Sequence, residues 1–167
     1  METKFNFSSQ ICTTREQSER LLALGLKKET ADCYYWQETE PMYGEAAGIW
    51  HLENLVSKDN QEHFEYLDKN FGVCLADDEE HYFIPAWSLH RLLCFLPKYI
   101  QVPDNVWEYK HDLYLSIDEE LNVRYEENVY EPCFDKTFWS GNIYQNCISC
   151  IKWLIKEGYF NKEYLEE

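Results

Sequence analysis

Hydrophobic and polar residues alternate along this chain in two periods, one typical of strands and one typical of helices. The clearest two-residue period covers residues 112–117, where Leu113, Leu115 and Ile117 share one side. A charged turn at residues 118–120 follows, and residues 122–126 alternate again with Val123 on the same side. Two alternating runs joined by a short polar turn predict an antiparallel hairpin with these aliphatic side chains facing inward.

The helical period is strongest near the end of the chain, where residues 142–157 predict a long amphipathic helix. Its expected buried stripe contains Ile143, Cys147, Cys150, Ile151, Leu154 and Ile155. Gly158 is placed to cap its C-terminus.

Two shorter helices are predicted earlier in the sequence. Ser88 is a suitable N-cap for a helix over residues 89–96, which Pro97 ends. Thr13 and Glu16 have the spacing of a capping box at the start of a helix that we expect over residues 15–26.

The remaining segments predict short strands and loops. Residues 33–36 are rich in aromatics and predict a strand, and residues 73–75 and 81–84 predict two more that form a hairpin. Residues 49–55 fit either element. Residues 59–70 predict a loop or a loop with a short helical turn, and the aromatic stretch 130–141 predicts a loop. Because the strands follow one another without long crossover helices, we expect an α+β fold: a mainly antiparallel sheet with about three helices packed on it. The length suits a single globular domain over residues 1–167.

Charge and aromatic content narrow the functional classes. The chain has 31 acidic against 15 basic residues, a formal charge of −16, and is 17% aromatic. Disordered acidic chains lack aromatics, so we expect the charge to cover a folded surface. Such a surface repels nucleic-acid backbones and anionic membranes and attracts basic proteins. No membrane span or signal peptide is found, so we expect a cytoplasmic protein.

The seven cysteines are an odd number, which argues against a disulfide framework. Cys147 and Cys150 have the spacing of a redox pair or half of a zinc site. Both lie on the apolar side of the predicted final helix, however, so we interpret them as packing residues. Cys33 and Cys133 stand beside polar residues and are the candidates for a nucleophile with a histidine base brought near by the fold.

Metal and phosphate sites have little support in the sequence. His51 with Glu53, and His63 with Glu62 or Glu65, can be combined into a hypothetical metal site, but the spacing of zinc-hydrolase motifs such as His-Glu-x-x-His is absent. The acidic run at residues 77–80 lacks the EF-hand pattern and predicts a solvated turn. No phosphate-binding glycine motif or serine nucleophile motif occurs, so we expect no cofactor, no metal and no catalytic residue.

The most suggestive segment is residues 104–131, where many carboxylates and aromatic rings face only two basic residues, Lys110 and Arg124. Proteins that mimic nucleic acids combine carboxylates with such rings to occupy basic grooves. We therefore select four glutamates as candidate partner-binding residues: Glu119, Glu120, Glu126 and Glu127. The alternative interpretation is a solvated hairpin in an acidic protein.

Three runs, at residues 19–32, 84–97 and 142–159, together resemble a family of small proteins of uncharacterised function from phages and mobile elements of gut anaerobic bacteria. The similarity touches about half of the chain, and segments 43–70 and 130–141 have no counterpart in it. It implies a bacterial cytoplasm and an accessory gene, and it transfers no site residues.

Three functional hypotheses follow. The first is a non-enzymatic interaction protein that binds a basic protein, for example as an inhibitor of a host protein that handles nucleic acids. The second is a small-molecule enzyme with a pocket of cysteine, histidine and carboxylate groups, and the third is an assembly component. The sequence does not identify the partner, any substrate or the oligomeric state.

Overall fold

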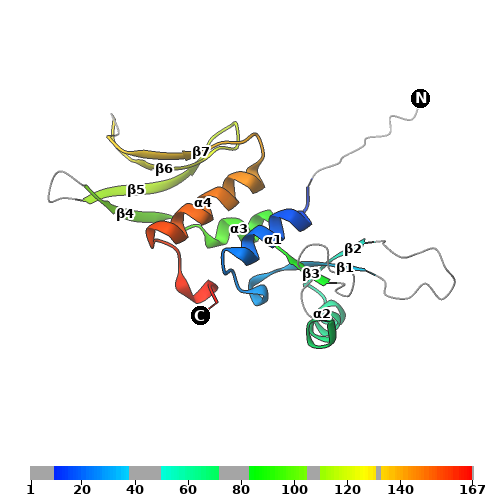
Figure 1. Cartoon of the computed structure of the whole chain (residues 1–167). Coiled ribbons are helices and arrows are strands. Elements are labelled where there is room, and N and C mark those ends of the chain that lie inside the picture. The colour runs from blue at the N-terminus through cyan, green and yellow to red at the C-terminus, as the bar shows by residue number, and fades with distance from the viewer. Residues whose placement is uncertain (1–9, 38–49, 72–82, 105–109, 131–132, 167) are drawn as a thin grey trace, which may run out of the picture.

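The computed structural model of the chain describes residues 10–37, 50–71, 83–104, 110–130 and 133–166 (Figure 1). The helical elements within these ranges are α1 (Arg15–Ala23), η1 (Lys28–Thr30), α2 (Lys58–Phe71), α3 (Leu89–Phe95), α4 (Ile143–Glu157) and η2 (Lys162–Tyr164). The strands are β1 (Cys33–Gln37), β2 (Trp50–Asn54), β3 (Phe83–Ala86), β4 (Tyr99–Pro103), β5 (Lys110–Ile117), β6 (Val123–Glu127) and β7 (Asp135–Phe138). All the strand pairs are antiparallel, so the α+β prediction is confirmed, with two sheets and four α-helices among the described residues.

The first helix begins at Arg15, as predicted, but its N-cap lies one residue later than expected and it ends three residues earlier. Thr14, not Thr13, is its N-cap and forms a capping box with Gln17: Gln17 N donates to Thr14 Oγ1, and Thr14 N donates to Gln17 Oε1. Thr13 is instead buried and shares a hydrogen bond of 2.7 Å with Ser18. The helix ends at Ala23, and Gly25 follows with a positive φ of 84° that a residue with a Cβ rarely adopts.

The smaller sheet has the order β2-β1-β3, and α2 packs against it. The contacts are aromatic and aliphatic: Phe64 and Leu67 of α2 meet Tyr34 of β1 and Phe83 of β3. The prediction of a loop over residues 59–70 is therefore wrong. Ser57 caps this helix by accepting a hydrogen bond from Asn60 N, and a narrow apolar stripe is enough to hold an otherwise polar helix on the sheet.

The strand predicted at residues 81–84 corresponds to β3, which pairs with β1. Its expected hairpin partner at residues 73–75 and the acidic turn at residues 77–80 lie outside the described residues. The ambiguous segment 49–55 forms β2.

The larger sheet has the order β4-β5-β6-β7 and contains the predicted hairpin as β5 and β6. Leu113 and Val123 are fully buried, as expected. Ile117 lies on the same side of the sheet, directly opposite Val123, but it is 41% exposed and does not contribute to the core as expected. The pairing of β4 with β5 extends only from Lys110 to Tyr114, which leaves Ile117 without a strand beside it on that side. Part of the predicted aromatic loop 130–141 is also wrong, because residues 135–138 form β7.

The helices α1, α3 and α4 lie between the two sheets (Figure 1). The final helix was predicted correctly, with Asn142 as N-cap and Gly158 in the left-handed conformation at its C-terminus. Cys147, Cys150, Ile151 and Leu154 are completely buried, and Trp153 contacts Tyr125 of β6 and Phe138 of β7. The helix thus covers one face of the larger sheet, which leaves the opposite face as a surface. Among the described residues, no helix is both long and apolar enough to cross a membrane.

Candidate functional site

The side chains of β4–β7 that point away from α4 form what we call the outer face of the larger sheet. Its members come from alternate positions of the four strands: Tyr99, Gln101, Pro103, Lys110, Asp112, Tyr114, Ser116, Arg124, Glu126, Asp135 and Thr137. Tyr99 and Tyr114 are 41% and 45% exposed, so this face is open to solvent. The alternation that buries Leu113 and Val123 on one side thereby presents carboxylates and tyrosine rings on the other.

Asp112 is held in place by its neighbours on β4. Its Oδ1 accepts hydrogen bonds from Tyr99 Oη at 2.6 Å and from Gln101 Nε2 at 3.0 Å. These two bonds, the tyrosine bond first, lower the pKa of Asp112, so the group is a carboxylate at neutral pH. The Tyr99 ring in turn lies 5.4 Å from the Tyr114 ring, between centroids.

Glu126 lies directly opposite Tyr114 on the neighbouring strand. Its Oε1 accepts a hydrogen bond of 2.9 Å from Ser116 Oγ, which comes from the same strand as Tyr114. On its other side Glu126 is paired with Asp135 of β7. Like charges directly opposite one another across strands are unfavourable, so this pair stabilises neither strand.

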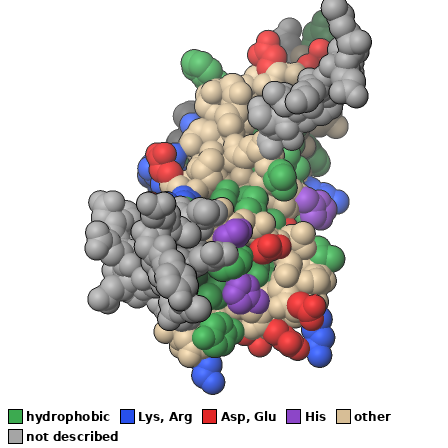
Figure 2. All heavy atoms as spheres, turned by 90° about the vertical axis from the view of Figure 1, so that its right-hand side faces the viewer, with side chains coloured by type: hydrophobic (Ala, Val, Ile, Leu, Met, Phe, Trp, Pro, Cys, Tyr) green, Lys and Arg blue, Asp and Glu red, His purple; other side chains and the backbone are tan. Residues whose placement is uncertain are grey.

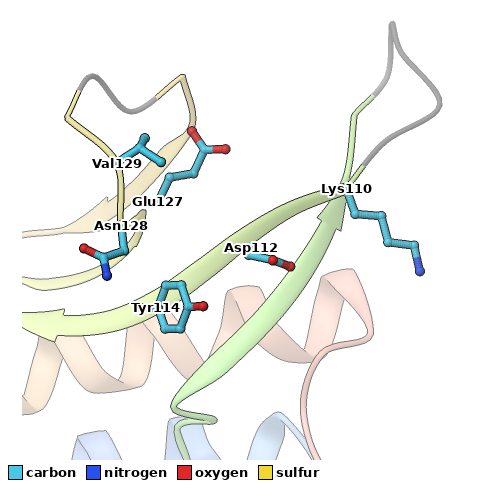
Figure 3. A pocket seen from close by; sticks show the side chains of 6 residues that line it. All are labelled: Lys110, Asp112, Tyr114, Glu127, Asn128 and Val129. Carbon is cyan, nitrogen blue, oxygen red and sulfur yellow. The ribbon is translucent and has the colours of Figure 1, made fainter.

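Two adjoining hollows run over β5 and β6, and we call them together the Tyr114 groove. One hollow, of about 320 Å³, is lined by Lys110, Asp112, Tyr114, Glu127, Asn128 and Val129. The other, of about 280 Å³, is lined by Tyr114, Ser116, Glu126, Glu127 and Asn128. Figure 3 shows Asp112 and Tyr114 on β5 and, across from them, Glu127 at the end of β6 with Asn128 and Val129 after it, while the Lys110 side chain extends away from this group. Volumes near the lower limit for ligand pockets suit a single side chain better than a cofactor.

Of the four glutamates selected from the sequence, Glu119 and Glu120 are exposed in the turn between β5 and β6, and Glu120 Oε2 accepts a hydrogen bond from Asn122 Nδ2. The turn is organised by Asp118, which accepts hydrogen bonds from Glu120 N and Asn122 N and pairs with Arg124. Hydrogen bonds from Asn122 are the main cause of a lowered pKa at Asp118. Glu119 and Glu120 are thus presented on a well-ordered turn.

Glu127 has a different environment. Its side chain is only 14% exposed, and its Oε1 bonds His111 Nδ1 at 2.5 Å. Its Oε2 accepts hydrogen bonds from the backbone N–H groups of Cys133 and Phe134. Glu127 therefore fastens the segment after β6 to the sheet, and it is not a freely solvated surface charge.

His111 is held between two carboxylates, because Asp104 Oδ2 lies 3.0 Å from its Nε2. The Phe134 ring stacks on it at 5.6 Å. The bond to Glu127 is the main cause of a raised pKa at His111, and the same bond lowers the pKa of Glu127. With both ring nitrogens donating to carboxylates, this histidine acts as a structural link in this arrangement and is not poised as a general base.

The aromatic residues of the acidic segment 104–131 fall into exposed and buried groups. Tyr114 and Tyr130 are exposed, while Tyr125 is fully buried and donates a hydrogen bond to the carbonyl oxygen of Pro97. Trp107, Tyr109, Glu108 and Glu131 lie outside the described residues. Tyr99 and Gln101 were not among the residues selected from the sequence. The alternation of the apolar Ile100 and Val102 with their neighbours is a strand signal that could have identified them.

The candidate cysteines occupy different settings. Cys147 and Cys150 are buried in the core, which confirms their interpretation as packing residues, and burial raises the pKa of both thiols. Cys33 packs with Cys12 and Ala86, and its hydrogen bond to Cys12 is the main cause of a raised pKa, which keeps this thiol protonated. Cys133 is exposed. This geometry gives the nucleophile hypothesis no support at Cys33.

His51 and His63 do not come together as metal ligands but flank a tryptophan. The His51 ring stacks on Trp36 at 4.5 Å, and the His63 ring meets it edge-on at 5.1 Å. His63 Nδ1 also lies 2.9 Å from Tyr34 Oη. Histidine side chains are visible among hydrophobic ones at this end of the molecule (Figure 2). Within the described ranges, no three His, Cys, Asp or Glu side chains are grouped so that they could hold a metal ion.

No protein-family model, no curated protein and no solved structure matches the chain. The function is therefore inferred from the geometry of the site alone.

Proposed function

We propose that this chain is a non-enzymatic interaction protein that binds a basic protein partner through the outer face of its larger sheet. The observation that carries the proposal is the division of this sheet into two chemically different faces. One face packs on α4, and the other presents Asp112, Glu126, Asp135 and two tyrosine rings to solvent. The exposed Glu119 and Glu120 extend the same negative surface at the end of the hairpin.

The charge of the whole chain supports a basic partner. A formal charge of −16 accelerates encounters with positively charged surfaces and disfavours nucleic acids and anionic membranes. Charged rims guide association, while exposed tyrosines supply contact area with little loss of side-chain entropy. A concrete form of this function, in keeping with the resemblance to phage and mobile-element proteins, is inhibition of a nucleic-acid-handling host protein whose basic groove the outer face occupies.

The proposal is tested by capturing partners from a bacterial lysate and then measuring association rates with the purified partner over a salt series. The test variant is the triple reversal Glu119→Lys, Glu120→Lys and Glu126→Lys, with Glu127 retained because it holds His111. We expect a strongly reduced association rate and a nearly unchanged dissociation rate, because rim charges act mainly on association. Salt should produce a similar reduction, since the Debye length falls from about 10 Å at 0.1 M to about 3 Å at 1 M.

A matched control changes the net charge equally but elsewhere. Glu16, Glu65 and Glu157 are exposed on α1, α2 and α4. If reversal of these three slows association as much as reversal of the hairpin set, only the overall charge matters and the outer face is not the binding surface. An association rate that is independent of salt would also reject the proposal.

A further inference from the structure

Two carboxylates of the Tyr114 groove are fixed through one oxygen each. Asp112 uses Oδ1 to accept the bonds from Tyr99 and Gln101, and Glu126 uses Oε1 to accept the bond from Ser116. Among the described residues, no hydrogen bond or ion pair involves Asp112 Oδ2 or Glu126 Oε2. Both groups are therefore oriented in advance, and each keeps an acceptor for a donor from outside the chain.

Tyr114 stands between these two acceptors. It lies two residues from Asp112 along β5, about 6.8 Å away for an antiparallel strand, and directly opposite Glu126, about 5 Å away between Cβ atoms. Its ring is 45% exposed and is supported from one side by the Tyr99 ring. The hollows on both sides of Tyr114 give a planar group access to the ring and to the carboxylates.

The basic residues nearest to the groove leave these acceptors unoccupied. Arg124 is turned towards the hairpin end by its pair with Asp118. Lys110 lines the first hollow, but no ion pair joins it to Asp112 within the part of the chain that the structure describes. A cation bound from outside would also relieve the repulsion between the facing carboxylates of Glu126 and Asp135.

We infer that the Tyr114 groove binds one arginine side chain of the basic partner, with its guanidinium on the Tyr114 ring and its N–H groups donating to Asp112 and Glu126. This inference rests on the proposed function and specifies its central contact. Arginine fits better than lysine because its planar guanidinium stacks on an aromatic ring and offers several donors at fixed angles. A lysine ammonium is more strongly hydrated and presents a single point charge.

The test is an NMR titration of the full chain with three short peptides at low salt: acetyl-Gly-Arg-Gly-amide and its lysine and citrulline counterparts. Citrulline keeps the planar shape without the charge. We expect the arginine peptide to shift the backbone amide signals of Tyr114, Ser116 and Asn128, the lysine peptide to bind more weakly and the citrulline peptide not to bind. Equal binding of the arginine and lysine peptides, shifts centred on Glu119 and Glu120, or no shifts at all would overturn the inference.

Variants separate the ring from the charge. Tyr114→Leu should weaken binding of the arginine peptide about two- to five-fold, the loss expected for one exposed cation–π contact. Glu126→Gln should weaken it as well, while the control Tyr130→Leu, at a tyrosine that is 99% exposed and outside the groove, should have no effect. Equal effects of the two tyrosine variants would reject the site.

Tyr114→Leu, together with the further variant Asp112→Asn, distinguishes this inference from the proposed function. If the basic partner loses affinity for the reversed hairpin variant but binds Tyr114→Leu and Asp112→Asn normally, the acidic face is the binding surface and the arginine site is rejected. If neither set of variants changes partner binding, both proposals fail.

Discussion

Replacing Tyr125 by phenylalanine tests whether the larger sheet has one structural face and one free face. The Tyr125 ring is fully buried against Trp153 of α4, and its hydroxyl donates to the carbonyl oxygen of Pro97 at 2.5 Å. Burial raises the pKa of this phenol, so it remains a donor at neutral and moderately alkaline pH. The substitution keeps the ring but leaves the Pro97 oxygen without its donor, which should lower the free energy of unfolding by about 1–3 kcal/mol.

The matched control is Tyr114→Phe, which removes a hydroxyl from the neighbouring strand on the outer face. This side chain is 45% exposed, so the change should stay within about 0.5 kcal/mol. Urea unfolding followed by tryptophan fluorescence measures both, and the slope with denaturant should be the same for all three proteins. If the two variants are equally stable, the difference between the faces is refuted, and with it the structural basis of the proposed function.

Three further predictions concern the frame that holds this face. Cys147→Asp should destabilise the protein by well over the ~1 kcal/mol of a typical substitution, because it places a charge in the core. Thermal unfolding measures this loss, and a small effect would contradict the packing role of Cys147. Gly158→Ala should cost about 1 kcal/mol in the same assay because φ is +79° there, and no loss would mean that the left-handed cap is not needed. The raised pKa of His111 makes its contribution to stability complete below about pH 6.5, its value when unfolded, and lost as pH rises through the folded value. The lowered pKa of Glu127 adds stability that is lost as the pH falls and the carboxylate is protonated. The urea midpoint of the unchanged protein should therefore fall at both low and high pH. It should change less with pH in Glu127→Gln, which lacks this carboxylate.

The elements with a strong period could be predicted from the sequence. The stripe through Cys147 and Leu154 identified α4, and the alternation around Leu113 identified β5. Both signals are local, since a period of 3.6 or 2 needs no information about partners. The helix α2 was missed because polar residues dominate it, and it packs mainly through Phe64 and Leu67.

The organisation of the candidate site depends on pairings that one sequence does not reveal. Glu127 faces Leu113 in the register of β5 and β6, and this brings its carboxylate to His111 two residues away. In the sequence it has the same appearance as Glu126, its neighbour on the outer face. A shift of the register by one residue would exchange their roles, so the assignment of each glutamate required the strand pairing.

The alternation along β5 and β6 also affects how this protein can evolve. Residues that hold the fold, such as Leu113 and Tyr125, alternate along the same strands with residues that meet solvent, such as Tyr114 and Glu126. Surface substitutions away from buried contacts usually change stability little. The outer face can therefore accumulate substitutions while the core stays the same, and under the proposed function such substitutions would change which partner is bound.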